Sequence, residues 1–479
     1  MLKNKSIEKE NLKWLSIPSD FIFDDSELRL NANSYSFEYL QAVSIIEKFK
    51  KKGVFVDKLG NLAKSVFVGA RSKRLYTSKD KGIPYLMPTE IFNFHLTPRK
   101  WIKPETEDSE NWFVEPYTIL ITQSGSVGRS ILVNELFKGI AISPNTIRYI
   151  PKEEYKDKVG YIYAWINTKF GQALITKNLY GITVKHIEPH HIENLPIPRL
   201  PEIEEEINNL ILKAHKLREE AQKELLEAEK LFYKELNLPK IDEDSIEYYG
   251  GEKGKEIKAF TIKASELNDR LDASYHIPLA HKVEEMLESN KKGEVKLLND
   301  VSQSFVPPRF KRFYVNDKEE GIPLIQGKYI PLIKLLDVKY IWKNMKNIEK
   351  YEIKKGWILI TRSGTIGQLT LVSDFWEGFL GSDHLIRIIP QDINSGYLTM
   401  FLLSDYGQIQ FQRLTYGGVV DEIGEAGDLF KFIKVLKPKD KKTEDKIDSL
   451  VIDAYNKKDQ ANILEQQAIE KLETFLTRF

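Results

Sequence analysis

Two long stretches of the chain repeat apolar residues at intervals of mostly three and four positions. The first begins at Pro201 and the second occupies the C-terminal part of the sequence. This spacing places the apolar side chains on one face of a helix that packs against another helix. Neither stretch contains Pro or Gly after its start, so each can form one continuous helix. The apolar positions are Ile203, Ile207, Leu210, Ile211, Ala214, Leu217, Ala221, Leu225, Ala228, Leu231 and Phe232 in the first stretch, and Ile447, Leu450, Val451, Ala454, Ala461, Leu464, Ala468, Leu472, Phe475 and Leu476 in the second.

Elsewhere the apolar segments are short, rich in β-branched residues and bounded by Gly, Ser or Pro, which is typical of β-strands. We expect short helices over Ser36–Lys50, Tyr161–Asn178 and Pro278–Glu288. The globular parts of the chain are therefore predicted to be α+β with a substantial sheet. The strands are predicted over Thr118–Thr122, Arg129–Val133 and Thr146–Ile150.

The chain contains an internal repeat with a period of about 240 residues, which is too long for a solenoid repeat of roughly 20–50 residues. The matching blocks occur in the same order in both halves, so each copy is a domain. They are SELRLNANSY and SELNDRLDASY, the Gly-Ile-Pro at Gly82 and at Gly321, ILITQSGSVG at Ile119 and ILITRSGTIG at Ile358, NTIRYIP and HLIRIIP, and GYIYAWINTKFGQ and GYLTMFLLSDYGQ.

The repeat and the helical stretches together predict the domain organisation. A single amphipathic helix would expose its apolar stripe, so we expect the two helices to pack together as an antiparallel coiled coil between two tandem, pseudo-symmetric globular domains. The segment between the copies is rich in Gly and acidic residues and is predicted to be a linker. The predicted boundaries are residues 1–200 for the first domain, 201–238 for the first helix, 239–260 for the linker, 261–438 for the second domain and 439–479 for the second helix.

An antiparallel pair of helices could act as a spacer between two domains that contact DNA. At 1.5 Å per residue, a helix of roughly 36 residues is about 54 Å long. Successive major-groove faces of DNA lie about 34–36 Å apart. The predicted helices are therefore long enough to hold two domains over two half-sites, whereas a small substrate would not require such a length.

The charge is unevenly distributed although the formal net charge is only +1. From Val54 to Lys103 there are ten Lys and Arg against three acidic residues, and from Pro201 to Leu238 there are six against ten. A basic region beside an acidic one is expected when one part of a protein contacts phosphates and another does not. The sequence has no cysteine and no apolar run near 18 residues, and its N-terminal residues lack the pattern of a secretory signal. We therefore expect a cytoplasmic protein without disulfides or membrane association.

The duplicated blocks resemble the specificity (S) subunits of type I restriction-modification systems. The resemblance covers most of the chain and is carried by RLDASY, the Gly-Ile-Pro strand start, the ILIT-x-SG-[ST]-[VI]-G segment and LPIPRLPEIEEEI before the first long helix. No single block is specific, but their ordered duplication is. The second copy departs from the pattern at its helix, where KVLKPKDKKTEDKI replaces the proline-rich run, which puts equal docking at both helices in doubt.

The resemblance implies that each globular copy is a target recognition domain for one half of a bipartite site in double-stranded DNA. It also implies that the paired helices set the spacing of the half-sites and dock two methyltransferase (M) subunits, with restriction (R) subunits in the full complex. The implied chain is non-catalytic and holds no cofactor of its own. S-adenosylmethionine, ATP and magnesium are expected on the partner subunits.

The loops Gly69–Tyr76 and Pro307–Tyr314 are counterparts that place basic residues beside aromatic ones. Arg and Lys bind phosphates, and Arg also binds guanine through two hydrogen bonds. An isolated basic loop would be a solvated surface loop, but its duplication favours DNA contact. The predicted DNA-binding residues in these loops are Arg71, Lys73 and Arg74 in the first copy and Arg309, Lys311 and Arg312 in the second.

Polar positions that differ between the copies are candidates for base recognition, because two domains that recognise different sequences share a frame and vary their contacting side chains. The glycines of the SGSVG and SGTIG segments are expected to form tight turns between strands, since a nucleotide P-loop would need a following Lys-Ser/Thr. A variable surface position without function is the alternative. The candidates that differ are Thr89, Gln123, Arg129, Thr183 and Lys185 in the first copy and Gln326, Lys328, Arg362 and Gln368 in the second; Ser124 and Ser363, which both copies share in the turn, are predicted DNA-binding residues as well.

No set of residues predicts a metal site or catalysis. His186, His190 and His191 have no histidine counterparts in the second copy, so we expect surface or packing histidines. Val306-Pro307-Pro308-Arg309 is similar to an amino-methyltransferase motif, but both flanking residues differ from it. Glu256-Ile257-Lys258 lies in the predicted linker without an identifiable partner Asp.

Two other functions are compatible with the sequence. The chain could be the specificity module of another DNA methylation or phage-defence system. It could also be a structural adaptor whose basic loops bind an acidic protein. Binding to particular bipartite DNA sequences would exclude the adaptor.

Overall fold

The structure is a computed structural model of the 479-residue chain, and it describes residues 16–17, 19, 32–71, 73–104, 109–180, 185–241, 259–267, 271–416, 422–423 and 432–478. The chain divides into two compact units. The first unit comprises Met1–Ile91, Leu96–Glu219 and Ala461–Phe479, and the second comprises Phe92–His95 and Glu220–Gln460. Most of the predicted linker and the predicted site residue Thr183 lie outside the described residues.

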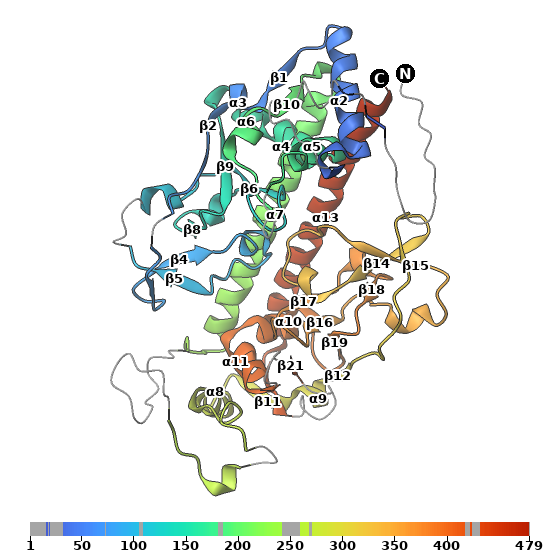
Figure 1. Cartoon of the computed structure of the whole chain (residues 1–479). Helices are drawn as coiled ribbons and strands as arrows, with labels where there is room; N and C mark the ends of the chain where they lie inside the picture. The colour runs from blue at the N-terminus through green and yellow to red at the C-terminus, as the bar shows by residue number, and fades with distance from the viewer. Residues whose placement is uncertain are drawn as a thin grey trace. The chain divides into compact units, whose positions relative to one another are not determined.

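The first unit contains two four-stranded sheets and a two-stranded ladder (Figure 1). The larger sheet is antiparallel with strand order β2-β9-β6-β7, and the smaller has the order β3-β5-β4-β8 with β4 and β8 parallel. The third ladder pairs β1 with β10. The strands are β1 Val56–Lys58, β2 Ala63–Val68, β3 Tyr76–Thr77, β4 Ile83–Leu86, β5 Lys100–Ile102, β6 Ile119–Thr122, β7 Ser130–Leu132, β8 Ala141–Ile142, β9 Thr146–Pro151 and β10 Pro196–Pro198; the helices are α2 Phe37–Lys51, α3 Leu59–Leu62, α4 Val159–Asn167, α5 Lys169–Thr176, α6 Pro189–Glu193 and α7 Pro201–Glu235.

The second unit repeats this topology strand for strand. Its sheets have the orders β12-β19-β16-β17 and β13-β15-β14-β18, its ladder pairs β11 with β22, and a further short ladder pairs β20 with β21. The internal repeat is therefore a repeat of fold. The strands are β11 Gly293–Leu297, β12 Ser302–Phe305, β13 Tyr314–Val315, β14 Gly321–Ile325, β15 Lys339–Trp342, β16 Ile358–Thr361, β17 Leu369–Leu371, β18 Leu380–Gly381, β19 Leu385–Pro390, β20 Thr415–Tyr416, β21 Glu422–Ile423 and β22 Lys434–Pro438; the helices are α8 Pro278–Glu288, α9 Leu298–Val301, α10 Ser395–Leu403, α11 Asp405–Arg413 and α13 Lys441–Arg478.

The predicted strands and two of the three short helices are confirmed within about two residues, but the helix predicted over Tyr161–Asn178 is wrong as a single element. The helix is interrupted at Thr168, which has an extended backbone. Thr168 caps α5 by accepting a hydrogen bond from the Gly171 amide at 3.0 Å. A Cβ at Gly171 would lie 2.1 Å from the Trp165 carbonyl oxygen. The apolar spacing continues through this break, so the spacing could not reveal it.

Each unit contains half of each long helix, and the halves pack antiparallel. In the first unit the start of α7 packs against the end of α13, through Glu206 with Lys471 and Arg218 with Glu465. In the second unit the end of α7 packs against the start of α13, where Lys457 pairs with Glu224. The predicted α+β fold with an antiparallel pair of long helices is confirmed.

The packing of α4 and α10 on the long helices fixes which helix positions are equivalent. A Cβ at Gly160 would lie 2.6 Å from the carbonyl oxygen of Asn208 on α7, and a Cβ at Gly396 would lie 2.6 Å from that of Asp448 on α13. Glycine therefore permits the same close helix contact in both units. Asn208 corresponds to Asp448, which makes Arg218 the counterpart of Lys458 and Leu225 the counterpart of Glu465.

The helix pair contains buried polar groups that the apolar spacing did not predict. Arg218 and Glu465 are buried together in the first unit, where the Tyr163 hydroxyl donates to Glu465 at 3.2 Å. The second unit instead buries Lys458 against the rings of Phe94, Trp376 and Tyr455 at 4.4–5.1 Å, with Asp459 at 3.8 Å. Burial lowers the pKa of Lys458.

His215, on α7 in the first unit, makes the stability of that unit dependent on pH. Burial and the nearby charge of Arg218 lower its pKa from 6.5 to about 4. Between these values the unfolded chain binds a proton that the folded chain does not, so stability is lost as the pH falls from about 6.5 to 4, by on the order of 3 kcal/mol. We expect the His215→Phe variant to lose this part of the pH dependence. Urea denaturation of both proteins at pH 7, 5 and 4 tests the prediction, and parallel losses of stability would contradict it.

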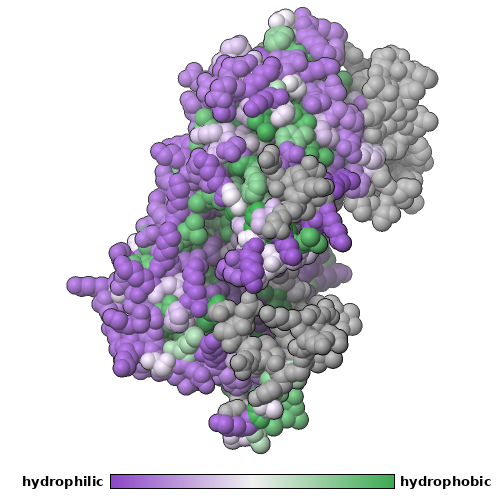
Figure 2. Space-filling model, turned by 90° about the vertical axis from the view of Figure 1, so that its left-hand side faces the viewer, coloured by the Kyte–Doolittle hydropathy of each residue, from purple (hydrophilic) through white to green (hydrophobic). Residues whose placement is uncertain are grey.

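On the face shown in Figure 2, hydrophilic side chains cover most of the described surface and apolar ones form scattered patches. Among the described residues, no helix has both the length and the apolarity needed to cross a membrane.

Candidate nucleic-acid interface

In each unit, loops from several strands meet at one place through direct contacts. The loops are the predicted basic loop, the Ser-Gly turn between the adjacent strands β6 and β7 or β16 and β17, and the loop before β9 or β19. The glycines of both turns have φ between +74° and +85°, at Gly125, Gly128, Gly364 and Gly367. The prediction that these glycines form tight turns is confirmed, because this backbone region is open mainly to glycine.

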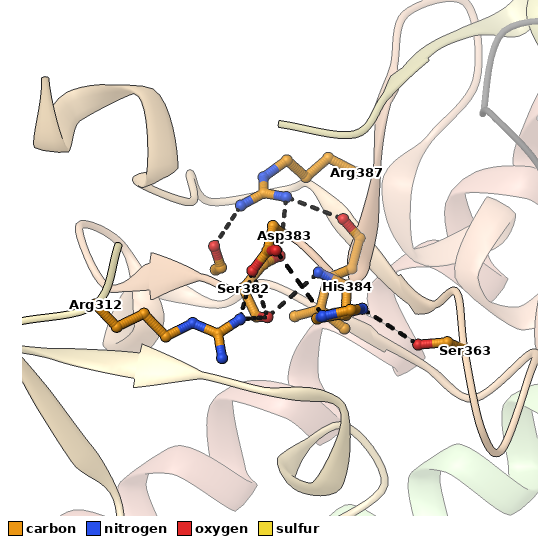
Figure 3. Close-up of polar contacts among 8 residues, drawn as sticks. Arg312, Ser363, Ser382, Asp383, His384 and Arg387 are labelled. Atoms are coloured by element: carbon orange, nitrogen blue, oxygen red, sulfur yellow. Dashed lines mark hydrogen bonds and ion pairs between the residues drawn. The ribbon is translucent and has the colours of Figure 1, made fainter. Parts of the chain in front are cut away.

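In the second unit the meeting point is an ion pair between the basic loop and the loop before β19 (Figure 3). Arg312 Nη2 lies 2.5 Å from Asp383 Oδ1 and 3.3 Å from Ser382 Oγ. Partial burial raises the pKa of Asp383, but the hydrogen bond and charge of Arg312 hold it below its ordinary value overall. The guanidinium therefore has a fixed position at the edge of this loop.

The Ser-Gly turn of the second unit contacts the same loop. Ser363 Oγ lies 3.3 Å from Nδ1 of His384, the residue that follows Asp383. The neighbouring Arg362 donates from Nε to the Ile423 carbonyl at 3.2 Å, which ties the turn to β21. Two predicted residues of the turn and one of the basic loop are thus brought together around Asp383 and His384.

The first unit builds a different network on the same frame. Arg71 Nη2 reaches the Gln123 side-chain oxygen at 3.5 Å, and Gln123 Nε2 donates to Glu188 at 3.3 Å. Tyr180 also donates to Glu188. Gln123 is only 1% exposed, so in this structure its amide belongs to the network beneath the surface. Arg74 is held separately, with Nη1 at 3.2 Å from the Tyr85 hydroxyl.

The remaining predicted residues that the structure describes lie on the same loops and adjoining strands. Base or phosphate contact by any of them stays a prediction. Lys73, Thr89, Lys185, Arg309, Lys311 and Lys328 are exposed, and Ser124, Arg129, Gln326 and Gln368 are half-buried.

A buried arginine beneath each network holds the loop in place. Arg148 donates to the carbonyl oxygens of Ile142 and Thr146 at 2.9 and 3.1 Å. Arg387 donates to the carbonyl oxygens of Gly381, Ser382 and Leu385 at 2.7–3.3 Å. Both side chains are at most 1% exposed, and burial lowers the pKa of each to about 10.

The two arginines are equivalent by sequence and by geometry. They lie 239 positions apart in the NTIRYIP and HLIRIIP blocks. Each lies over an aromatic ring of the neighbouring strand, Phe67 at 5.9 Å and Phe305 at 5.7 Å. The shared Arg within an otherwise apolar strand was the signal in the sequence, and its role was missed because strand spacing does not reveal which polar group is buried.

Sequence reasoning also missed Asp383, His384 and Glu188, which hold the predicted residues in place. Asp383 and His384 correspond to Pro144 and Asn145 in the first copy, so comparison of the copies could have identified them as variable polar positions. Glu188 has no such signal, because its partner Gln123 is distant in sequence.

The three histidines of the first copy take part in packing. His191 Nδ1 accepts a hydrogen bond from the Glu188 amide at 2.9 Å, and the rings of His190 and His191 lie 4.0 Å apart. Tyr180 and His186 form an isolated β-bridge. Within the part of the chain that the structure describes, no group of three His, Asp or Glu side chains is arranged to hold a metal ion.

Comparison with known proteins gives one family match and distant structural likenesses. Residues 290–425 match the family model described as the type I restriction modification DNA specificity domain. No curated protein matches the chain. A solved S subunit of a type I restriction-modification system from M. genitalium is 13% identical over 88% of this chain and 94% of its own, with a TM-score of 0.35. The HsdS subunit from Thermoanaerobacter tengcongensis is 11% identical over 87% and 96%, with a TM-score of 0.26.

Neither structural likeness is strong enough to support an argument, so only the family match is used below. The match falls on the second unit and covers both of its four-stranded sheets, including Arg312, Asp383 and the Ser-Gly turn. Residues 290–425 of the second unit are therefore similar to the type I restriction modification DNA specificity domain.

Proposed function

We propose that each unit recognises one half of a bipartite sequence in double-stranded DNA. The observation that supports this most directly is the difference between two networks built on one frame. In the first unit the basic loop and the Ser-Gly turn connect through Arg71 and Gln123 to Glu188, whereas in the second unit Arg312 of the basic loop pairs with Asp383 and Ser363 of the turn contacts His384. Different donors and acceptors on equivalent loops suit recognition of two different half-sites.

The long helices α7 and α13 are the proposed docking sites for two methyltransferase subunits, with restriction subunits joining the full complex. On this proposal the chain itself is non-catalytic. S-adenosylmethionine, ATP and magnesium belong to the partner subunits, where the methyl transfer and DNA cleavage take place.

The methylated sequences of the source organism test the proposal. We expect a bipartite, asymmetric motif with methyladenine on both strands, which disappears when the gene is deleted and returns when it is restored. A restored gene in which the loops that carry Arg312 and Asp383 are replaced by those of another specificity subunit should change only one half of the motif. An unchanged set of methylated motifs after deletion would contradict the proposed function, and binding to an acidic protein without DNA would support an adaptor instead.

A further inference from the structure

The smaller sheet of each unit carries an exposed lysine over an exposed tyrosine. Lys100 Nζ lies 4.9 Å from the ring centre of Tyr76, and Lys339 Nζ lies 5.0 Å from that of Tyr314. The two tyrosines are 49% and 47% exposed. At these distances the ammonium group interacts favourably with the ring and remains open to solvent on its other side.

The two pairs occupy the same positions in the sheet. Tyr76 on β3 is directly opposite Ile102 on β5, and Tyr314 on β13 is directly opposite Ile341 on β15. The lysines, two residues before those partners, are the diagonal neighbours, and alternation along a strand keeps them on the face of the tyrosine. The pair is therefore a duplicated feature of the frame.

These lysines differ from the exposed lysines that form ion pairs. Lys138 and Lys355 have carboxylates at 2.6 and 2.7 Å, on Glu135 and Asp374 respectively. Among the described residues, Lys100 and Lys339 have no carboxylate partner, so each keeps an uncompensated positive charge. A ring beneath the ammonium restricts its motion without neutralising it, which favours binding of an external anion.

The basic loop leads directly into the strand that carries the tyrosine, β3 or β13. Arg74 and Arg312 precede Tyr76 and Tyr314 by two residues, and Arg74 lies 5.8 Å from the ring of Tyr85. Further lysines lie over aromatic rings beside them, Lys79 over the half-buried Trp101 at 5.8 Å and Lys311 over the exposed Phe313 at 5.2 Å. The surface thus combines closely spaced cations with aromatic rings and adjoins the two networks described above.

We propose that Lys100 with Tyr76 and Lys339 with Tyr314 form a matched pair of phosphate-binding clamps, one in each unit, that hold the DNA backbone regardless of its sequence. The inference rests on the proposed function and adds residues to it. Two different half-sites have only their phosphate backbone in common. The pair of lysine and tyrosine is the same in both units, whereas the network residues differ.

Binding of the full chain to two duplexes tests the clamps. One duplex carries the methylated motif of the source organism and the other a scrambled sequence, and each is titrated over a range of potassium chloride concentrations. For the Lys100→Gln/Lys339→Gln variant we expect the slope of log affinity against log salt to fall by about 1.8, or about 0.9 per lost phosphate contact. We also expect roughly tenfold weaker binding to both duplexes at about 0.1 M salt, so that their ratio stays unchanged.

Two sets of control variants separate the clamp from other effects. Lys138→Gln/Lys355→Gln removes the same charge from ion-paired lysines and is expected to leave the slope unchanged. Tyr76→Phe/Tyr314→Phe keeps the rings and should bind as the wild type does, whereas Tyr76→Ala/Tyr314→Ala should lose part of the affinity that the lysine variant loses. Thermal unfolding of each variant checks that the fold is intact.

The outcomes distinguish the clamps from the proposed function. An unchanged salt slope in the lysine variant, or a loss confined to the motif duplex, overturns the clamps but leaves sequence recognition standing. A large loss in the alanine variant without one in the lysine variant also overturns them and indicates base stacking. If the wild type binds both duplexes equally and the lysine variant weakens both, the clamps stand and the proposed function fails. If the wild type binds neither duplex, both fail.

Discussion

Replacing Arg218 by alanine is expected to destabilise the first unit by about 3–5 kcal/mol. Arg218 and Glu465 each have only 8% of the side chain exposed, and the Arg218 guanidinium also donates to Asn462 at 2.7 Å. Removal of the arginine leaves the Glu465 carboxylate buried without its counter-charge, which is a far larger cost than the loss of an exposed ion pair. Urea denaturation followed by circular dichroism measures the change in the free energy of unfolding.

The equivalent position of the helix pair in the second unit supplies a control. Leu225 occupies in α7 the position that Glu465 occupies in α13, so the helix pair accepts leucine at the equivalent site. The Arg218→Met/Glu465→Leu variant should therefore recover most of the lost stability, since a buried ion pair can be replaced by apolar residues at little cost. Lys471→Ala, which breaks the half-exposed pair with Glu206, should cost less than about 1 kcal/mol. Equal effects of Arg218→Ala and Lys471→Ala would contradict the prediction.

Replacing Arg387 by methionine is expected to cost about 3 kcal/mol or more and to impair DNA recognition by the second unit. The substitution removes a donor from three carbonyl oxygens, of which that of Ser382 keeps a second donor, the Leu385 amide. A buried carbonyl oxygen left without a partner costs about 1–3 kcal/mol. The freed loop carries Asp383, which positions Arg312. We expect the unfolding midpoint to fall and the preference for the motif duplex over the scrambled one to decrease.

The first unit provides the comparison for this variant. Arg148→Met should cause a similar loss of stability there, because Arg148 holds the equivalent loop through Ile142 and Thr146. The variant should then no longer distinguish the correct sequence from other sequences in the other half of the motif. Arg309→Met removes an exposed arginine and should change the stability by less than about 0.5 kcal/mol. Full stability of both buried variants would show that the loops do not depend on these arginines.

Much of the fold could be predicted because its determinants are local or repeated. Helices α2 and α8, strands β6, β7 and β9 and both long helices follow the apolar spacing of the sequence. The turn glycines could be identified because a positive φ restricts the residue type, and glycine stands at both turns in both copies. The break between α4 and α5 could not, since it depends on Thr168 as a cap and on the contact of Gly171 with Trp165.

The candidate interface could be predicted only in part. Basic residues of the loops and the turn were identified by comparing the two copies, and the structure brings Arg71 to Gln123 and Arg312 to the loop that also contacts Ser363. Whether these side chains contact bases or phosphates stays a prediction. The carboxylates that hold them, Glu188 and Asp383, were missed because an acidic residue is rarely expected beside a DNA contact.

By itself the sequence determined that one α+β frame occurs twice, that each copy ends in a long helix, and that basic loops occupy matching positions. These properties depend on hydrophobic spacing, turn residues and repetition, which are visible along the chain. Only the tertiary structure decided which polar groups are buried and which partners they have. Arg148 and Arg387 hold loops, Arg218 and Lys458 lie in different environments at equivalent helix positions, and Lys100 and Lys339 lie over tyrosines. Burial and pairing of this kind arise from contacts between segments distant in sequence, where the free energy of a charge depends on its neighbours in space.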